Sequence, residues 1–330
     1  MQHEIRLATF NVCNLALPGM KFYDNLDPYT EEEYDARTTW IAQQIDRVDA
    51  DIIAFQEIFS QAALKNALAK TQRYRDAHHV GFDPDPLAPR LTPSVALVSR
   101  LPLASDPVTH ITLPHGLSIH LPGVAEPVTR FTRPILHVQI AVAAELTIQV
   151  FVTHLKSKQP DYRSQEFPSD PYHAGVATLR SLIRRGTEAL GLRYLLNEHM
   201  QGPRAPLVVM GDFNDVANSV STSLVTGSHI GTDGFSNRLF DCYRIQSRRN
   251  PSHDIGFTHL HDGIYETVDH VLVSEEFNQA SPLAIGEVLE VLCLNDHVVL
   301  RRPEASDHGL VLVRIKLYEP TNESMSASYY

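Results

Sequence analysis

Asp212 and Asn214 stand two positions apart at the end of the apolar run Leu207–Met210. As long as the strand predicted there persists, both side chains share the face of Val208 and Met210. A carboxylate can accept a proton from water, and a carboxamide can donate to an anionic oxygen without adding charge. The pair therefore suits attack by water on a phosphate. The alternative is an ordinary Asp/Asn turn after a strand.

Glu57 is a second carboxylate at a strand end. It closes the run Asp51–Glu57, where alternation places it on the face of Ile53 and Phe55. A carboxylate buried there without a partner is unfavourable. A divalent cation would compensate, and Mg²⁺ takes one or two protein carboxylates while it keeps several waters. The alternative is a glutamate that points into solvent.

Asp307 and His308 are adjacent and precede another apolar run. The carboxylate of Asp307 offers a metal ligand, and the imidazole of His308 suits proton transfer. Asp269 begins a separate apolar run and could orient the His308 ring and fix its tautomer. The alternative is a surface His/Asp pair. The chain has 17 histidines, so single histidines are weak evidence, and none of the others outside a motif, His259 among them, is given a role.

His154, Lys156 and Lys158 recur at every second position after the run Thr147–His154. In an extended segment they would form a row of donors suited to phosphate oxygens. The alternative is a solvated strand end with two ordinary lysines, and we prefer it for Lys158.

The elements that must position these residues are strands that alternate with helices. Asn11, Glu57, His154 and Asp212 end apolar runs, whereas Asp269 and His308 begin them. If the two groups of strands run antiparallel, all these ends reach the same rim. The predicted strands are Ile5–Asn11, Asp51–Glu57, Ser94–Ser99, Thr147–His154, Leu207–Asp212, Val268–Ser274 and His308–Leu317.

Three helices are predicted between these strands. A capping box of Thr30 and Glu33 begins the first, and a short helix follows Ser60. The third spans 173–200, with Gly186 and Gly191 as weak points. Its apolar positions are Val176, Leu179, Ile183, Leu190 and Tyr194. The stretch 219–268 is predicted as a long loop. We expect one α/β domain over 1–318 and a polar tail over 319–330.

The composition of the 330-residue chain is that of an ordinary globular protein, with 43% hydrophobic and 20% charged residues. The net charge of −11 means that contact with a polyanion requires a local basic patch. Cys13, Cys242 and Cys293 are odd in number and widely spaced, which favours reduced thiols and a cytoplasmic location. No signal region or membrane-length apolar run is visible in this chain, although a trimmed sequence would give the same picture.

Taken together, seven blocks resemble the endonuclease/exonuclease/phosphatase family, the DNase I-like metal-dependent phosphoesterases. In chain order they are TFN with Asn11, FQE with Glu57, SVALVSR at Ser94–Arg100, THLKSK with His154, GDFND with Asp212 and Asn214, VDHVLVS with Asp269, and SDHG with Asp307 and His308. The resemblance spans residue 5 to about residue 317. It implies a four-layer α/β/β/α sandwich of two mixed sheets with the site at one rim.

The resemblance also implies roles for the matching residues. Glu57, Asp307 and Asn11 would hold Mg²⁺ or Mn²⁺. Asp212 would position or deprotonate the attacking water, and Asn214 and His154 would bind the scissile phosphate. Lys156, from the row that it would form with His154 and Lys158, is a further expected phosphate contact. His308, oriented by Asp269, would stabilise charge or transfer a proton.

The substrate is left open among three classes. THLKSK and VDHVLVS look most like bacterial extracellular-nuclease members, which favours hydrolysis of phosphodiester bonds in DNA or RNA. The acidic composition favours a phosphatase or phosphodiesterase acting on a lipid head group or small metabolite. A non-catalytic binding module is the third class, and the complete polar set argues against it. The basic segments 70–75, 180–185 and 244–249 could contact nucleic acid or could be solvated surface.

Overall fold

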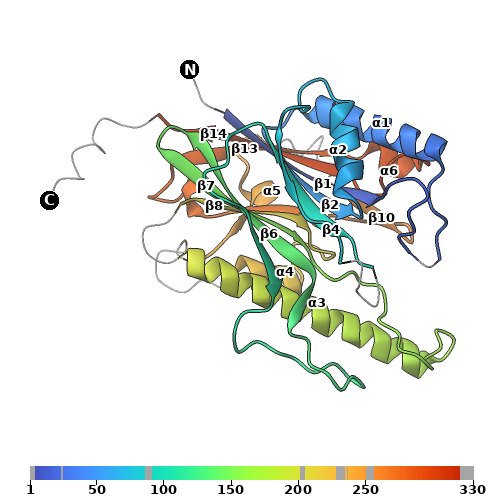
Figure 1. Ribbon diagram of the computed structural model, residues 1–330. Helices are drawn as coiled ribbons and strands as arrows, with labels where there is room; N and C mark the ends of the chain where they lie inside the picture. The colour runs from blue at the N-terminus through green and yellow to red at the C-terminus, as the bar shows by residue number, and fades with distance from the viewer. Residues whose placement is uncertain are drawn as a thin grey trace.

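Two six-stranded mixed sheets form the centre of the structure, a computed structural model (Figure 1). It describes residues 4–23, 25–85, 91–200, 205–227, 235, 237–249 and 256–319. The first sheet has the order β13 (Gly286–Leu294), β14 (Leu310–Leu317), β1 (Glu4–Leu15), β2 (Ile52–Ile58), β4 (Ser94–Ser99), β3 (His78–Gly81). The second has the order β5 (Val108–Thr112), β6 (Arg130–Ala143), β7 (Leu146–His154), β8 (Leu207–Asp212), β12 (Asp269–Val273), β9 (Phe240–Asp241).

Parallel pairing occurs between β1 and β2 and between β7 and β8, and the other neighbours in each sheet are antiparallel. The expected antiparallel relation between the two groups of strands is therefore confirmed. The carboxyl ends of β1, β2, β7 and β8 therefore lie at one rim. The start of β12 and the segment that leads into β14 lie at the same rim.

Helices cover the outer face of each sheet. One layer of side chains joins the first sheet to α1 (Glu31–Val48) and α2 (Gln61–Ala69), and another joins the second sheet to α3 (Pro171–His199) and α4 (Val220–Thr226). A third apolar layer lies between the sheets. The predicted four-layer α/β/β/α sandwich is thus confirmed. The remaining short elements are α5 (Cys242–Ile245), a 3₁₀ helix (Glu275–Phe277), α6 (Asp296–Leu300), and the hairpin of β10 (His259–His261) and β11 (Ile264–Glu266).

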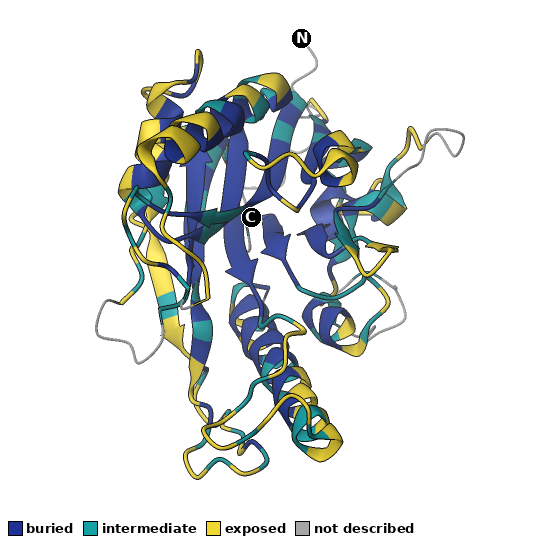
Figure 2. Ribbon diagram, turned by 90° about the vertical axis from the view of Figure 1, so that its right-hand side faces the viewer, coloured by how far each residue is buried: buried dark blue, intermediate teal, exposed yellow. Residues whose placement is uncertain are grey.

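Alternation along β8 shows how the layers fix side-chain direction. Val208 and Met210 lie between the sheets, whereas Leu207 and Val209 pack toward α3. The central strands, such as β8 and β12, are buried on both faces, as the dark blue centre of Figure 2 shows. Asp212 continues the face of Val208 and Met210, so its carboxylate enters the space between the sheets at their rim.

The predicted start of α1 is confirmed. Thr30 accepts from the backbone N–H of Glu33, and the Glu33 carboxylate accepts from the N–H of Thr30 at 2.9 Å. Ser60 caps α2 in the same way through the N–H of Ala63. The three cysteines form no disulfide.

The segment 219–268 was predicted as a loop, and this is wrong in the part that the structure describes. It contains α4, β9, α5, β10 and β11, none longer than seven residues. Such short elements leave no periodic pattern to read. The predicted tail, 319–330, lies outside the described residues except for Glu319. It stays a prediction, as does the single-domain organisation.

The long helix α3 runs through both glycines that were expected to weaken it. Two of its predicted apolar positions are exposed, Leu179 at 45% and Tyr194 at 42%, whereas Ile183 packs partly against the second sheet. The apolar residues that α3 buries lie mostly in its second half: Ala189, Leu192, Leu195 and Leu196. The buried face of its first half is more polar because it holds loops, as the contacts of Arg180 with Glu166 illustrate. No described helix is long and apolar enough to cross a bilayer.

A cluster of imidazoles lies away from the rim, where the end of α3 meets β6. The ring of His137 stacks on Phe151 with centroids 4.2 Å apart. The ring centroids of His199 and His110 lie 4.6 and 6.0 Å from the centroid of His137. Burial, followed by the charges of His199 and His110, lowers the pKa of His137 to about 4. Glu198 is the charged group that opposes this effect on His199 and His110.

We expect this cluster to destabilise the protein in acid. An unfolded histidine titrates near pH 6.5, whereas folded His137 titrates near pH 4. Between these two pH values the unfolded state binds a proton that the folded state does not bind. The free energy of unfolding therefore falls by up to about 3 kcal/mol as the pH drops through this range. Urea unfolding of wild type and His137→Asn from pH 7 to pH 4.5 should show a shallower dependence in the variant. The exposed His115→Asn is the control, and equal slopes for His137→Asn and wild type would contradict the expectation.

Candidate active site

The predicted residues converge on one cavity of about 490 Å³ at the rim between the sheets. A larger hollow of about 1010 Å³ beside α3 and α4 contains none of them. The predicted residues that line the rim cavity are Glu57, His154, Asp212, Asn214, Asp307 and His308. Asn11 and Asp269 lie directly behind it, each in contact with a lining residue.

Asp212 is the buried centre of this set. Its Oδ2 atom accepts from Nδ2 of Asn11 at 3.0 Å and from Nδ2 of Asn214 at 3.2 Å. The Nε2 atoms of His154 and His308 lie 3.3 and 3.9 Å from the same oxygen. Because β1 belongs to one sheet and β7 and β8 to the other, Asp212 joins the two sheets through hydrogen bonds.

Asn214 lies beyond the end of β8, so strand alternation does not relate it to Asp212. Its backbone has a φ of 53°, and its N–H donates to Oδ1 of Asp212 at 2.7 Å. Asp212 and Asn214 therefore form an Asp/Asn turn and also place two polar side chains together. The turn predicted as the alternative and the polar pair are both present.

Gly211 permits this strand end. It has a φ of 149°, and a Cβ atom there would lie 1.9 Å from the carbonyl oxygen of Thr153 on β7. Only glycine allows β7 and β8 to approach closely at this point.

His308 is oriented by Asp269. The Nδ1 atom of the ring donates to Oδ2 of Asp269 at 2.8 Å, which leaves Nε2 facing Asp212. Asp269 and Asp212 are opposite each other in the antiparallel pairing of β12 with β8. The predicted His308–Asp269 contact is therefore present in the structure.

Burial and charge shift the pKa values of the cluster in different directions. Burial raises the pKa of Asp212 to about 7, Asp269 adds to the rise, and His308 opposes it. Burial lowers the pKa of His308, but the carboxylates of Asp269 and Asp212 outweigh it and raise this pKa well above its ordinary value. The pKa of His154 is lowered well below its ordinary value by burial and then by Arg133. These shifts favour the charged form of His308 and the neutral form of His154.

Glu57 reaches the cavity through a bulge. Regular alternation would place it under α1 and α2 with Ile53 and Phe55, but Ile58 occupies that layer instead. The pairing of β2 with β4 shifts register at this residue, and its φ is 64°. Positive φ in a residue with a side chain is strained, and such strain gathers at functional sites. The cavity residues that share this conformation are Cys13, Asn14, Glu57 and Asn214.

Asn11 donates to carboxylates rather than offering an oxygen to the cavity. Its Nδ2 reaches Glu57 at 3.1 Å as well as Asp212, and its Oδ1 accepts from the N–H of Cys13. This geometry does not support the expected metal-ligand role of Asn11. It indicates that the residue orients the two carboxylates.

The donor atoms at the rim fit a divalent cation. Three sets have donor atoms within 4.8 Å of one another: Glu57 with His154 and Asp212; Asp212 with Asp269 and His308; and His259 with Asp307 and His308. The carboxylates gathered here carry more negative charge than the imidazolium of His308 balances. Oxygen ligands in this excess suit Mg²⁺ or Mn²⁺.

The expected row of His154, Lys156 and Lys158 is not formed, because β7 ends at His154. Nζ of Lys156 donates to the carbonyls of Ser157 and Gln159, and Lys156 does not line the cavity. Lys158 lines it, but its Nζ lies 3.0 Å from both carboxylate oxygens of Glu266.

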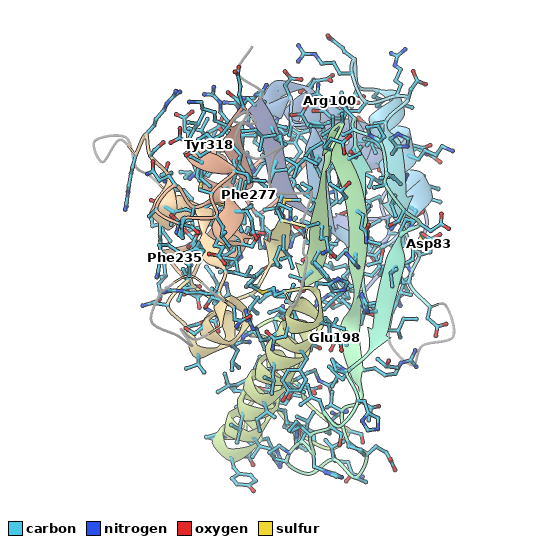
Figure 3. All side chains as sticks on the ribbon, turned by 90° about the vertical axis from the view of Figure 1, so that its left-hand side faces the viewer. Asp83, Arg100, Glu198, Phe235, Phe277 and Tyr318 are labelled. Carbon is cyan, nitrogen blue, oxygen red and sulfur yellow. The ribbon has the colours of Figure 1, made fainter. Side chains whose placement is uncertain are left out.

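Arg100 ends the SVALVSR block but follows Ser99, which pairs with Ile52 at the start of β2, whereas Glu57 lies near the other end of that strand. Figure 3 labels Arg100 near the top of the molecule. Its guanidinium bonds Asp49 at 2.6 Å and Asp51 at 2.9 Å. This end of the block is therefore structural.

His259 and Arg133 are among the cavity residues that were given no role from the sequence. His259 on β10 forms a backbone bridge to His308, with ring centroids 4.8 Å apart. Nothing in the sequence distinguishes it from the other histidines. Arg133 on β6 also lines the cavity, and it belongs to none of the seven blocks.

We expect Asp269→Asn to lower the pKa of His308, since it removes the carboxylate that most strongly favours the charged ring. The measurement is long-range ¹H–¹⁵N NMR of the histidine rings across pH, without added metal. The pKa of His137, about 4, should not change and serves as the internal control. An unchanged pKa of His308 in the variant would show that another group stabilises the charged ring.

Comparisons with known proteins agree with the fold. The chain is similar to an endonuclease/exonuclease/phosphatase from Bacteroides vulgatus, with a TM-score of 0.60 and 18% identity over 96% of this chain and 99% of that one. The human Nocturnin catalytic domain with bound sulfate anion gives a TM-score of 0.57 and 17% identity over 96% of each chain. Truncated TDP2 from Caenorhabditis elegans gives 0.55 and 13% identity over 95% of this chain and 97% of that one.

At these identities the solved structures show a common fold. A search of curated proteins found no significant match. The Endonuclease/Exonuclease/phosphatase family profile, in contrast, matches residues 8–308, which include all the residues of the cavity. The chain therefore belongs to the endonuclease/exonuclease/phosphatase family.

Proposed function

We propose that this protein is a divalent-metal-dependent phosphoesterase that hydrolyses phosphodiester bonds, with DNA or RNA as the first substrate class. The observation that carries the proposal is the buried Asp212 carboxylate surrounded by Asn214, His154 and the His308–Asp269 pair. A binding module gains nothing from an ionisable cluster that burial makes unfavourable. The family, whose name covers nucleases and phosphatases, supports the reaction class.

Asp212 positions the attacking water and accepts its proton, because its carboxylate is the acceptor on which the other polar groups converge. Asn214 and His154 lie beside it and contact its Oδ2 atom at 3.2 and 3.3 Å, and each would exchange this contact for an oxygen of the scissile phosphate when substrate binds. His308, whose environment favours the charged ring, presents Nε2 to the same carboxylate oxygen at 3.9 Å, where it stabilises the negative charge that develops.

Glu57 and Asp307 are the residues that would hold the metal from the cavity side, and both line it. A bound Mg²⁺ or Mn²⁺ supplies charge neutralisation of the phosphate and of its leaving oxygen. Asn11 contributes indirectly, because it keeps the Glu57 carboxylate in place through a hydrogen bond of 3.1 Å.

We expect Asp212→Ala to lower the rate of hydrolysis at least 10²–10³-fold, since it removes the central acceptor of the site. The assay follows plasmid nicking and single-strand degradation with Mg²⁺, with Mn²⁺ and with chelator. Asp106→Ala, a change at an exposed carboxylate, is the control and should retain full activity. Absence of cleavage by wild type with every divalent metal would overturn the nuclease assignment.

We expect Glu57→Gln to raise the Mg²⁺ concentration needed for half-maximal activity by tenfold or more, because a neutral amide is a weaker ligand for a hard cation. The measurement is a Mg²⁺ titration of initial rates at fixed substrate. Glu126→Gln, at an exposed position, is the matched control. An unchanged Mg²⁺ requirement would remove Glu57 from the metal site.

A small phosphorylated metabolite or lipid head group is the second candidate substrate, favoured by how the basic segments are used. Lys70 bonds Asp35, Arg73 bonds Asp49, Arg180 bonds Glu166, and Arg185 bonds Asp215. Cations held in internal pairs contribute little to binding a phosphate backbone.

Salt dependence separates the two substrate classes. A polynucleotide substrate predicts a KM that rises steeply between 50 and about 200 mM salt as counterion release weakens. A small substrate predicts saturable turnover of one member of a phosphoester panel with a shallow salt response. Metal-independent binding without turnover, unaffected by Asp212→Ala, would instead indicate the non-catalytic module.

A further inference from the structure

His259 brings an imidazole without a hydrogen-bond partner to the rim cavity, next to a proposed metal ligand. One of its ring nitrogens, a carboxylate oxygen of Asp307 and a ring nitrogen of His308 lie within 4.8 Å of one another. His259 and Asp307 both line the cavity. The ring of His259 contacts the rings of His308 and His261, but within the described part of the chain its nitrogens form no hydrogen bond.

His308 is the member of this set whose nitrogens are already used. Its Nδ1 atom donates to Oδ2 of Asp269 at 2.8 Å, and its Nε2 atom faces Oδ2 of Asp212 at 3.9 Å. No described lysine or arginine forms an ion pair with Asp307. His259 and Asp307 are therefore the two members that keep a donor atom for something bound in the cavity.

The backbone around His259 fixes where its ring can lie. His259 forms an antiparallel bridge with His308, and the preceding residue, Thr258, is fully buried. The carbonyl of Thr258 accepts from the N–H of Gly309 at 2.6 Å, and its N–H donates to the carbonyl of Glu266 at 2.9 Å. The β10–β11 hairpin is thus attached to the segment that carries Asp307. A ligand bound by His259 would order little more than the rotation of its ring.

We propose that His259 is a nitrogen ligand of the metal that Asp307 and Glu57 hold, and that it makes this site selective for a first-row transition metal such as Mn²⁺ over Mg²⁺. This inference rests on the proposed function, which requires that metal. Mg²⁺ takes oxygen ligands, whereas imidazole nitrogen suits the transition metals. His259 lies outside the seven blocks, so the family resemblance does not imply this ligand.

The first experiment is pulsed EPR of the full chain loaded with Mn²⁺, without substrate, which detects the nitrogen of a directly bound imidazole. We expect nitrogen modulation in wild type and its loss in His259→Phe, whose phenyl ring preserves the contact with His308. Wild type without nitrogen modulation, or His259→Phe with unchanged modulation, would overturn the assignment. The wild-type spectrum is decisive in the first case even if the variant fails to fold.

His261→Asn is the matched control for this spectrum and should retain the modulation. His261 shares the face of β10 with His259 and also lines the cavity. Its side chain is 74% exposed, and it lies outside the set of close donor atoms. Loss of the modulation in His261→Asn, with retention in His259→Phe, would contradict the choice of His259.

Calorimetric titration of the same proteins with MnCl₂ and with MgCl₂ measures selectivity. We expect His259→Phe to bind Mn²⁺ at least tenfold more weakly while its Mg²⁺ affinity changes less than threefold, because the lost ligand is a nitrogen. His259→Asp replaces that nitrogen with oxygen and should bind both metals, with a smaller preference for Mn²⁺ than wild type. Equal losses for the two metals in His259→Phe, or no loss for either, would overturn the selectivity.

Kinetics distinguish failure of this inference from failure of the proposed function. If wild type hydrolyses phosphoesters, His259→Phe should raise the Mn²⁺ concentration for half-maximal rate at least tenfold and leave the corresponding Mg²⁺ concentration nearly unchanged. An unchanged Mn²⁺ requirement would overturn the inference alone. If wild type hydrolyses no phosphoester but shows a nitrogen signal that His259→Phe removes, the metal ligand stands and the proposed function fails.

Discussion

The mutual repulsion of two buried carboxylates is the constraint on which the rim depends. The antiparallel register of β8 and β12 sets Asp212 opposite Asp269. In a medium of low polarity two such charges cannot both persist without compensation. His308 compensates Asp269 through a direct bond, and Asn11 and Asn214 donate to Asp212. The polar residues at the rim are thus the partners that two carboxylates in such close register require.

The same constraint explains why local strain gathers at the rim. Regular strands would direct Glu57 under the helices and would separate β7 from β8 at Gly211. The bulge at Glu57 and the unusual backbone of Gly211 bring carboxylates from both sheets to one cavity. The positive φ of Glu57 costs of order 1–3 kcal/mol and persists where the surrounding structure determines it, whereas glycine adopts positive φ at Gly211 without that cost. The close-packed layers between and outside the sheets provide that support.

Period-two alternation made much of this predictable. The faces of Asp212 and His154 follow from the apolar residues two positions before them, because β7 and β8 are regular to their ends. The four-layer sandwich was predicted from the order of the seven blocks that resemble the family. Alternation failed at Glu57, where a bulge resets the pattern, and at Lys156, which lies beyond the last strand residue.

The sequence did not predict the residues that reach the cavity only through the tertiary fold. Arg133 and His259 reach the cavity only because β6 and the β10–β11 hairpin are placed by the fold. The inward face of α3 was obscure for a related reason. Its polar residues, such as Arg180 and Glu188, bind loops, and no sequence pattern announces which loop a helix will hold.

The place of β1 in the first sheet has a consequence for biosynthesis. β1 lies between β2 and β14, and Glu4 pairs with Lys316 near the other end of the described chain. During translation one edge of β1 therefore stays unpaired until β14 has left the ribosome. At about 5–20 residues per second this interval lasts roughly 15–60 s. For that time an apolar strand edge is open to other nascent chains, so the folding yield in the cell should depend on chaperones that cover the N-terminal half.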